Sequence, residues 1–199
     1  MSEKELNIFD RKIIGISGSA RSGKDTLGSN IVQILSDQGI KAKTVSFANE
    51  LKESVNKFLI DQTGISAFTE DDEEKKLIRP FLVCWGTEIM RSIDDRIWID
   101  KLEENLSSDC VNIITDVRFK NELDWIKQNN GLTVFLNREN VKPANKFEEE
   151  NNKILSKGSD LSFHIGNFED ERIIFLTSNE ILDKLINNEI FNLWKATCH

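Results

Sequence analysis

Nine consecutive residues near the start of the chain have the types and the spacing of a phosphate-binding loop. They are Gly18, Ser19, Ala20, Arg21, Ser22, Gly23, Lys24, Asp25 and Thr26. Glycines at the two ends permit backbone angles that turn successive N–H groups toward one centre, where an anion can be held. Lys24 stands where a lysine reaches the β- and γ-phosphates of a nucleoside triphosphate. We therefore predict that this segment binds a nucleoside triphosphate; the alternative is a glycine-rich turn between a strand and a helix, with a surface lysine.

Magnesium would be bound beside this loop, and the sequence offers several oxygen ligands for it. The common form of the motif places Ser or Thr directly after the lysine, whereas this chain has Asp25 there and Thr26 one position later. An aspartate can bind a hard cation directly or through water, so either residue could support Mg²⁺. Asp116 follows the apolar run 111–115 and is a further candidate, with capping of the next helix as the alternative.

Two groups of basic residues could serve the transfer of a phosphoryl group. Arg118 and Arg138 each come close to the end of an apolar run, and forked hydrogen bonds from arginine suit the charge that spreads over the group in transfer. Each could instead form a surface salt bridge. The catalytic candidates are Lys24, Asp116, Arg118 and Arg138.

A second basic group could hold the acceptor of the phosphoryl group. Lys52 lies early in one helical pattern, and Arg79 and Arg91 lie on a long central one. Gly86 and Thr87 interrupt that central pattern, which would let the backbone approach a neighbour closely. The alternative is a helix glycine packed against another element, and spacing alone does not separate the two.

These residues need a scaffold, and the hydrophobic pattern predicts one. Apolar, β-branched runs alternate with helical periodicity, which is typical of right-handed βαβ units and a parallel sheet. We expect a three-layer α/β fold with a five-stranded parallel sheet, helices on both faces and ligands at the carboxyl ends of the strands. The predicted strands are 13–17, 43–47, 111–115, 132–136 and 172–177. The predicted helices are 25–37, one with Leu51 and Val55 on its apolar face, 73–92, 94–105, 119–128, about 146–156, and one with Ile181 and Leu185.

Composition limits the classes of protein to which the chain could belong. Its 199 residues fit one domain over 1–199, with a lid at about 139–166 as one interpretation of that lysine-bearing segment and an ordinary polar excursion as the other. The net charge of −8 argues against a nucleic-acid binder. We expect no membrane span, no disulfide framework from three cysteines, and a cytoplasmic location. The acidic residues 71–74 suit a capped helix start better than a metal site.

Several short motifs, in their order along the chain, resemble the deoxynucleoside monophosphate kinases of tailed phages and their bacterial relatives. The resemblance covers roughly residues 12–187 and includes the Gly-Lys-Asp-Thr variant of the loop. The other motifs are Ser46-Phe47-Ala48 with Leu51-Lys52, Gly86-Thr87-Glu88, Asp95-Arg96-Ile97-Trp98, Thr115-Asp116-Val117-Arg118 with Glu122, then Gly131 and Arg138.

The resemblance implies an adenylate-kinase-like core and ATP-dependent phosphorylation of a deoxynucleoside monophosphate to the diphosphate. It implies a monophosphate pocket at Lys52, Arg79 and Thr87, to which Arg91 is added as a candidate, and it places Arg118 and Arg138 near the transferred phosphate. His164 resembles a histidine near the family's lid, although the residues after it differ. The resemblance also allows a homodimer, for which the apolar pieces 85–90 and 191–194 are candidates.

Two other functions fit the same residues. The chain could be a kinase of the same fold that acts on another small acceptor, either a nucleoside or a phosphorylated metabolite. It could also be a non-catalytic module that senses ATP. The sensor is disfavoured because a pure binder has less need of Arg118 and Arg138 around the γ-phosphate.

Overall fold

The computed structural model describes residues 13–166 and Asn179. The chain divides into two compact units, of which the second is the continuous segment Val45–Leu106 and the first is formed by the residues on either side of it. We call the first the sheet unit and the second the helical unit. Among the described helices, none is long and apolar enough to cross a membrane.

The sheet unit is built on five strands in the order β2-β3-β1-β4-β5. Parallel pairing joins β1 to β3, β1 to β4 and β4 to β5, with Ile14 opposite Ile113 and Gly15 opposite Thr133. The strand β1, which leads into the glycine-rich loop, therefore lies in the middle of the sheet. The strand bounds are β1 (Ile13–Ser17), β2 (Ala42–Val45), β3 (Val111–Val117), β4 (Leu132–Arg138) and β5 (Leu161–Ile165).

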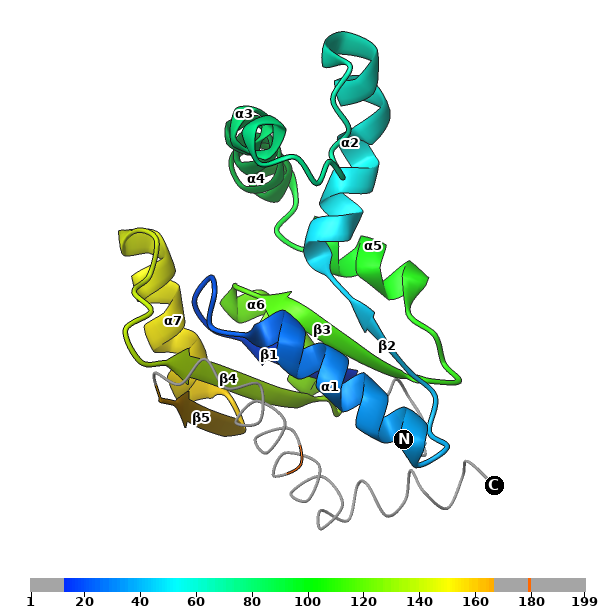
Figure 1. The fold of residues 1–199 in the computed structure, drawn as a ribbon, viewed down its shortest axis with the longest axis vertical. Helices are drawn as coiled ribbons and strands as arrows, with labels where there is room; N and C mark the ends of the chain where they lie inside the picture. The colour runs from blue at the N-terminus through cyan, green and yellow to red at the C-terminus, as the bar shows by residue number, and fades with distance from the viewer. Residues whose placement is uncertain (1–12, 167–178, 180–199) are drawn as a thin grey trace, which may run out of the picture. The chain divides into compact units, whose positions relative to one another are not determined.

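Helices cover both faces of this sheet, as predicted. On one face α1 (Lys24–Asp37) buries Leu27 and Ile31 against Ile14 and Ile16 of β1. On the other, α6 (Lys120–Gln128) packs against β1 and β4, and α7 (Lys146–Gly158) packs against α6. Figure 1 shows α1 in front of the sheet and α6 behind it. The three-layer α/β fold with a five-stranded sheet is confirmed.

The helical unit contains the predicted helices and one feature that periodicity did not reveal. Its elements are α2 (Phe47–Thr63), α3 (Asp72–Val83), the π-helix η1 (Cys84–Met90), α4 (Arg91–Ile93) and α5 (Ile97–Asn105). The predicted helix 73–92 is therefore nearly continuous, but its hydrogen bonding changes at Cys84 and returns to the α pattern at Arg91.

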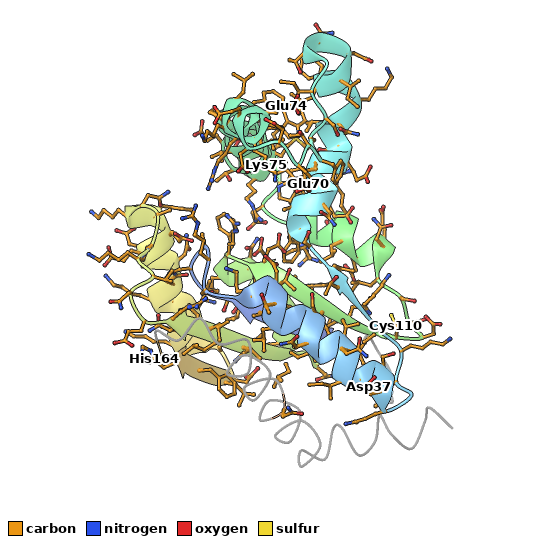
Figure 2. The ribbon with its side chains drawn as sticks, viewed as in Figure 1. Asp37, Glu70, Glu74, Lys75, Cys110 and His164 are labelled. Atoms are coloured by element: carbon orange, nitrogen blue, oxygen red, sulfur yellow. The ribbon has the colours of Figure 1, made fainter. Side chains whose placement is uncertain are left out.

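The acidic segment before α3 is a capped helix start, as predicted. The side chain of Asp71 accepts hydrogen bonds from the backbone N–H groups of Glu73 and Glu74, at 2.9 and 3.0 Å. Lys75 pairs with Glu70 at 3.0 Å, and Figure 2 shows the two side chains together beside Glu74. The hydrogen bond from Lys75 lowers the pKa of Glu70. The carboxylates of Asp71 and Glu70 thus have structural roles, the first as the cap of α3 and the second as the partner of Lys75.

Two element predictions near the sheet differ from the structure. Phe47 was expected in a strand, yet it begins α2, because the side chain of Ser46 accepts the N–H of Asn49 and starts a helix there. The segment 139–166, for which the only predicted element is the helix at about 146–156, also contains β5. The strand predicted at 172–177 and the last predicted helix lie outside the described residues.

Candidate active site

The loop between β1 and α1 has, at both of its ends, a backbone conformation that favours glycine. Gly18 has φ of 141° and Gly23 has φ of 94°, both in the region that side chains rarely allow. A Cβ atom on Gly18 would also lie 2.2 Å from the carbonyl oxygen of Leu136 on β4. Gly23 is the N-cap of α1 and supplies no side-chain cap, so the helix presents its first N–H groups and its positive dipole end to the loop. This is the backbone of an anion-binding site.

The ammonium group of Lys24 forms hydrogen bonds with the loop that precedes it. Its Nζ donates to the carbonyl oxygens of Gly18 and Ser19, at 2.9 and 2.7 Å. Burial lowers the pKa of Lys24, and the nearby guanidinium of Arg118 lowers it further, while Asp25 and Asp116 act in the opposite sense. The structure therefore brings Asp116 and Arg118 close to Lys24 and Asp25 of the loop.

Ser22 places a buried hydroxyl group inside the loop. Its side chain is completely buried, and its Oγ is the one buried side-chain polar atom without a hydrogen-bond partner in the described part of the chain. It lies within the loop, since a Cβ on Gly18 would come within 3.1 Å of it. A buried hydroxyl without a partner is unfavourable by about 1–3 kcal/mol, so a phosphate oxygen or water in the loop would satisfy it.

The carboxylates near the loop suit magnesium only in combination with a nucleotide. Residues 13–166 contain no group of three or more His, Cys, Asp or Glu side chains arranged to hold a metal. Mg²⁺ commonly uses one or two carboxylates together with substrate phosphates, and Asp25 and Asp116 both act on Lys24. Asp25 and Asp116 therefore fit a Mg²⁺ ion that is shared with bound phosphates, and their role as its ligands stays a prediction.

Two residues of α7 contact the loop, and sequence analysis did not identify either. Glu148 accepts the backbone N–H of Ala20 at 3.1 Å, from 128 residues further along the chain. Asn152 donates to the Oγ of Ser19 at 2.9 Å. In the sequence, Glu148 has a sufficient local explanation as an acidic residue in the first turn of a helix, where the N-cap Asn145 accepts its N–H. The pattern therefore gave no reason to pair α7 with the loop.

Arg118 and Arg138 lie at the carboxyl ends of β3 and β4, as predicted. The buried carboxylate of Glu122 accepts the N–H groups of Arg118 and Phe119, at 2.7 and 3.1 Å, and so fixes the turn from β3 into α6. Arg138 is the last residue of β4 and is in register with Ile165 of β5. The next strand places His164 at the surface, where its ring lies 3.2 Å from the side chain of Asn137 (Figure 2).

The predicted acceptor residues all lie in the helical unit. Lys52, on α2, places its Nζ 5.4 Å from the ring centre of Phe68, within the range of a cation–π contact. Arg79 is exposed on α3, and Thr87 lies within η1. Arg91 begins α4 and donates to the carbonyl oxygen of Asp95 at 3.4 Å. No structural observation assigns a ligand to these four residues, so their roles stay predictions.

Comparison with known proteins gives the chain its relatives. The family described as phosphomevalonate kinase matches residues 16–131, which is more than half of the chain. A deoxynucleoside-5'-monophosphate kinase of Escherichia phage T5 is 38% identical over 44% of this chain and 37% of its own length. A protein of Acanthamoeba polyphaga mimivirus that carries the name of a deoxynucleotide monophosphate kinase is 29% identical over 65% of this chain and 75% of its own length.

The first of these relatives is matched over little more than a third of its length. Among solved structures, the APS kinase CysC of Mycobacterium tuberculosis gives a TM-score of 0.46 at 13% identity, covering 88% of this chain and 97% of that one. The resemblance of the motifs to deoxynucleoside monophosphate kinases is confirmed by the two sequence relatives.

Proposed function

Because the chain belongs to the phosphomevalonate kinase family of P-loop kinases, we propose that it transfers a phosphoryl group from ATP to a deoxynucleoside monophosphate. The observation that carries the proposal is the loop itself. Its backbone is shaped for an anion, its buried Ser22 hydroxyl lacks a partner among the described residues, and Lys24 is surrounded by Asp25, Asp116 and Arg118. A site of this composition serves phosphoryl transfer from a triphosphate.

The class of acceptor is supported by what the printed names of the relatives have in common. Phosphomevalonate and a deoxynucleoside monophosphate both already carry a phosphate monoester, so either would accept the new group on a phosphate oxygen. The two sequence relatives are both named for the nucleotide, which favours a deoxynucleoside monophosphate. A phosphorylated metabolite is the second candidate, and the family description is the observation that favours it.

Each unit has a part in the proposal. In the sheet unit, residues 18–26 hold the triphosphate, with Lys24 following the γ-phosphate and Arg118 and Arg138 covering it. In the helical unit, Lys52, Arg79, Thr87 and Arg91 hold the acceptor phosphate. When bound, Mg²⁺ would neutralise charge on the β- and γ-phosphates, with Asp25, Thr26 and Asp116 as the residues that would hold it.

The proposed reaction is a direct, in-line displacement without a covalent enzyme intermediate. The attacking oxygen of the acceptor phosphate is already anionic near neutral pH, so no strong general base is needed. Acceleration then comes from positioning and from positive charge placed where negative charge develops. The chain's own contribution is to hold two phosphate groups, supply Lys24, Arg118 and Arg138, and exclude water from them.

The remaining parts of the proposal concern a lid and a location. We propose that the lid is the part of 139–166 before β5, because β5 itself is paired with β4.

A cytoplasmic location is supported by Cys84 and Cys110, which are free thiols. Fractionation of cells that express the tagged chain would test the location.

The proposal is tested by ADP formation from ATP and Mg²⁺ with a panel of acceptors. The panel contains deoxy- and ribonucleoside monophosphates, nucleosides and phosphorylated metabolites including phosphomevalonate, and Lys24→Ala is the control. We expect turnover with at least one deoxynucleoside monophosphate, and a fall of about 100-fold or more in Lys24→Ala because a transition-state charge contact is lost.

Other results would point to the alternatives. Turnover with phosphomevalonate or another metabolite, and with no nucleotide, would show that the acceptor is that metabolite, while the proposed kinase activity would stand. Tight binding of ATP without turnover for any acceptor would favour the ATP sensor and overturn the proposed activity.

A further inference from the structure

We infer that Gly86 and the indole of Trp98 form a positioning junction that fixes the predicted acceptor residues Lys52 and Thr87 relative to each other. The inference rests on the proposed function, because the acceptor roles of those two residues come from it. It concerns the helical unit alone. Neither junction residue is assigned a contact with substrate, so both are positioning residues.

The first observation is a hydrogen bond inside the π-helix. Gly86 is buried in η1, and its carbonyl oxygen accepts the Nε1–H of Trp98 from α5 at 2.9 Å. Trp98 is only 2% exposed, so its indole N–H depends on this acceptor. Short π-helical segments are strained relative to the α-helix and frequently mark functional sites, which gives a reason to look at what this one carries. It carries Thr87.

The second observation is a close approach between two helices. A Cβ atom on Gly86 would lie 2.0 Å from Cδ1 and 3.1 Å from Cγ of Leu51, which belongs to α2. Real Cβ atoms essentially never lie so close to another atom, so a side chain at 86 would force Leu51 into another rotamer or push α2 and η1 apart. The missing side chain at position 86 is therefore what allows Leu51 to pack there.

Together these contacts join three elements at one residue. Gly86 contacts α2 through Leu51 and α5 through Trp98, and it lies in η1 itself. Lys52 directly follows Leu51, and Thr87 directly follows Gly86. Any shift at the junction is therefore passed to both predicted acceptor residues. Three motifs that the sequence displays separately, at 46–52, 86–88 and 95–98, meet in this one contact.

The consequence for function is a defined acceptor geometry. The Nζ of Lys52 also lies 5.4 Å from the ring centre of Phe68, so a shift of α2 would strain or break this cation–π contact. Misplacement of a positioning group by about 1 Å can cost about 100-fold in rate. The junction should thus affect binding of the acceptor and not binding of ATP, whose predicted residues lie in the sheet unit.

The test uses Gly86→Ala and its compensation by Leu51→Ala in the full chain. We expect Gly86→Ala to raise the KM and the calorimetric Kd for the acceptor about tenfold or more, and to leave the Kd for ATP within about twofold. Leu51→Ala removes the atoms that the new Cβ meets. The double variant should therefore bind the acceptor better than Gly86→Ala alone, which a general loss of stability would not produce.

A second variant tests the hydrogen bond. Trp98→Phe removes the N–H that Gly86 accepts and should raise the KM for the acceptor while ATP binding persists. Its matched control is Trp125→Phe, because Trp125 is an equally buried tryptophan, 3% exposed, on α6 of the sheet unit. Both variants lose packing and should have a lower Tm, but only Trp98→Phe should change acceptor binding.

The outcomes separate this inference from the proposed function. Binding is measured with the monophosphates of the panel as probes, with and without turnover. If the wild type binds a deoxynucleoside monophosphate but Gly86→Ala and Trp98→Phe bind it equally well, the junction inference is wrong and the proposed function stands. If Leu51→Ala gives no rescue, or if ATP binding falls in parallel, the junction is structural only. If the wild type binds no acceptor, both are overturned.

Discussion

Lys24 lies in the loop at the position where we propose that a phosphate group binds. Its ammonium group is satisfied by the carbonyl oxygens of Gly18 and Ser19, and burial together with Arg118 lowers its pKa. A bound triphosphate would place anionic oxygens near this group and favour its charged form. The pKa of Lys24 should therefore rise when ATP binds, from a value below its ordinary 10.5.

This change predicts proton uptake on nucleotide binding at alkaline pH. Between the lowered pKa of Lys24 without ATP and its higher pKa with ATP, the side chain is neutral in the ATP-free protein and charged in the complex. ATP affinity therefore falls as pH rises through this range. The same lowered pKa means that the unfolded chain holds this proton more tightly, so the contribution of Lys24 to stability rises with pH between the lowered pKa of the folded chain and the ordinary 10.5. Calorimetry in two buffers of different ionisation enthalpy measures the uptake.

The control for this experiment is Lys41→Ala. Lys41 lies in the same unit, is largely exposed and pairs with Asp109 at 3.3 Å. Its removal should leave the proton uptake unchanged. An ATP affinity that stays constant up to pH 10.5 would contradict the prediction.

At the scale of elements, α7 contacts the loop through two polar side chains. Glu148 takes the N–H of Ala20, a group that a phosphate oxygen could otherwise use, and it places a negative charge near Lys24. Asn152 ties the same helix to Ser19. The segment from 139 to the end of α7, proposed above as a lid, is therefore attached to the loop by polar contacts that nucleotide can replace.

Replacement of the charge on α7 should strengthen ATP binding. Glu148→Gln keeps the size and one acceptor oxygen but removes a negative charge from the neighbourhood of the triphosphate, so we expect the Kd for ATP to fall by about threefold or more. Glu149→Gln is the matched control, because Glu149 changes the same charge on the same helix but pairs with Lys153 at 2.7 Å. Fluorescence titration with a labelled nucleotide measures both.

Weaker binding by Glu148→Gln would instead mean that the carboxylate organises the loop.

Limited proteolysis of the wild type in the same titration tests the lid. Cleavage between 139 and 158 should change on addition of ATP and acceptor, and an unchanged pattern would remove the lid from the proposal.

At the scale of the whole molecule, the association of chains is open to a direct measurement. The segment 85–90, which the resemblance offers for a homodimer, includes Ile89, and this apolar side chain is 40% exposed. We expect light scattering to give twice the chain mass of 22.8 kDa for the wild type. Ile89→Glu should give the single-chain mass, because a carboxylate is costly to bury in an apolar interface.

The control for the dimer is Ile154→Glu. Ile154 lies on α7 of the sheet unit and is 44% exposed, so the same charge is added at a similar exposure outside the candidate segment. This variant should keep the wild-type mass. A wild type of single-chain mass would remove the homodimer from the proposal.

The sequence by itself determined the features of this protein that depend on residues adjacent along the chain. The strand, glycine loop and helix from 13 to 37 are contiguous, so the positive φ of Gly18 and Gly23 and the placement of Lys24 follow from local chemistry. Hydrophobic periodicity likewise predicted most helices and the sheet. Arg118 and Arg138 follow predicted strands closely, so they were expected at the carboxyl ends of the strands, where parallel sheets bind ligands.

What only the tertiary structure decided depends on residues far apart along the chain. The alternation of Leu161, Phe163 and Ile165 is short, and it becomes a strand because β4 pairs with it. Glu148 and Asn152 meet the loop across 128 and 133 residues, and Trp98 meets Gly86 from another helix. Such contacts form when packed elements bring polar and apolar groups into reach, and no local pattern encodes which distant partner will satisfy them.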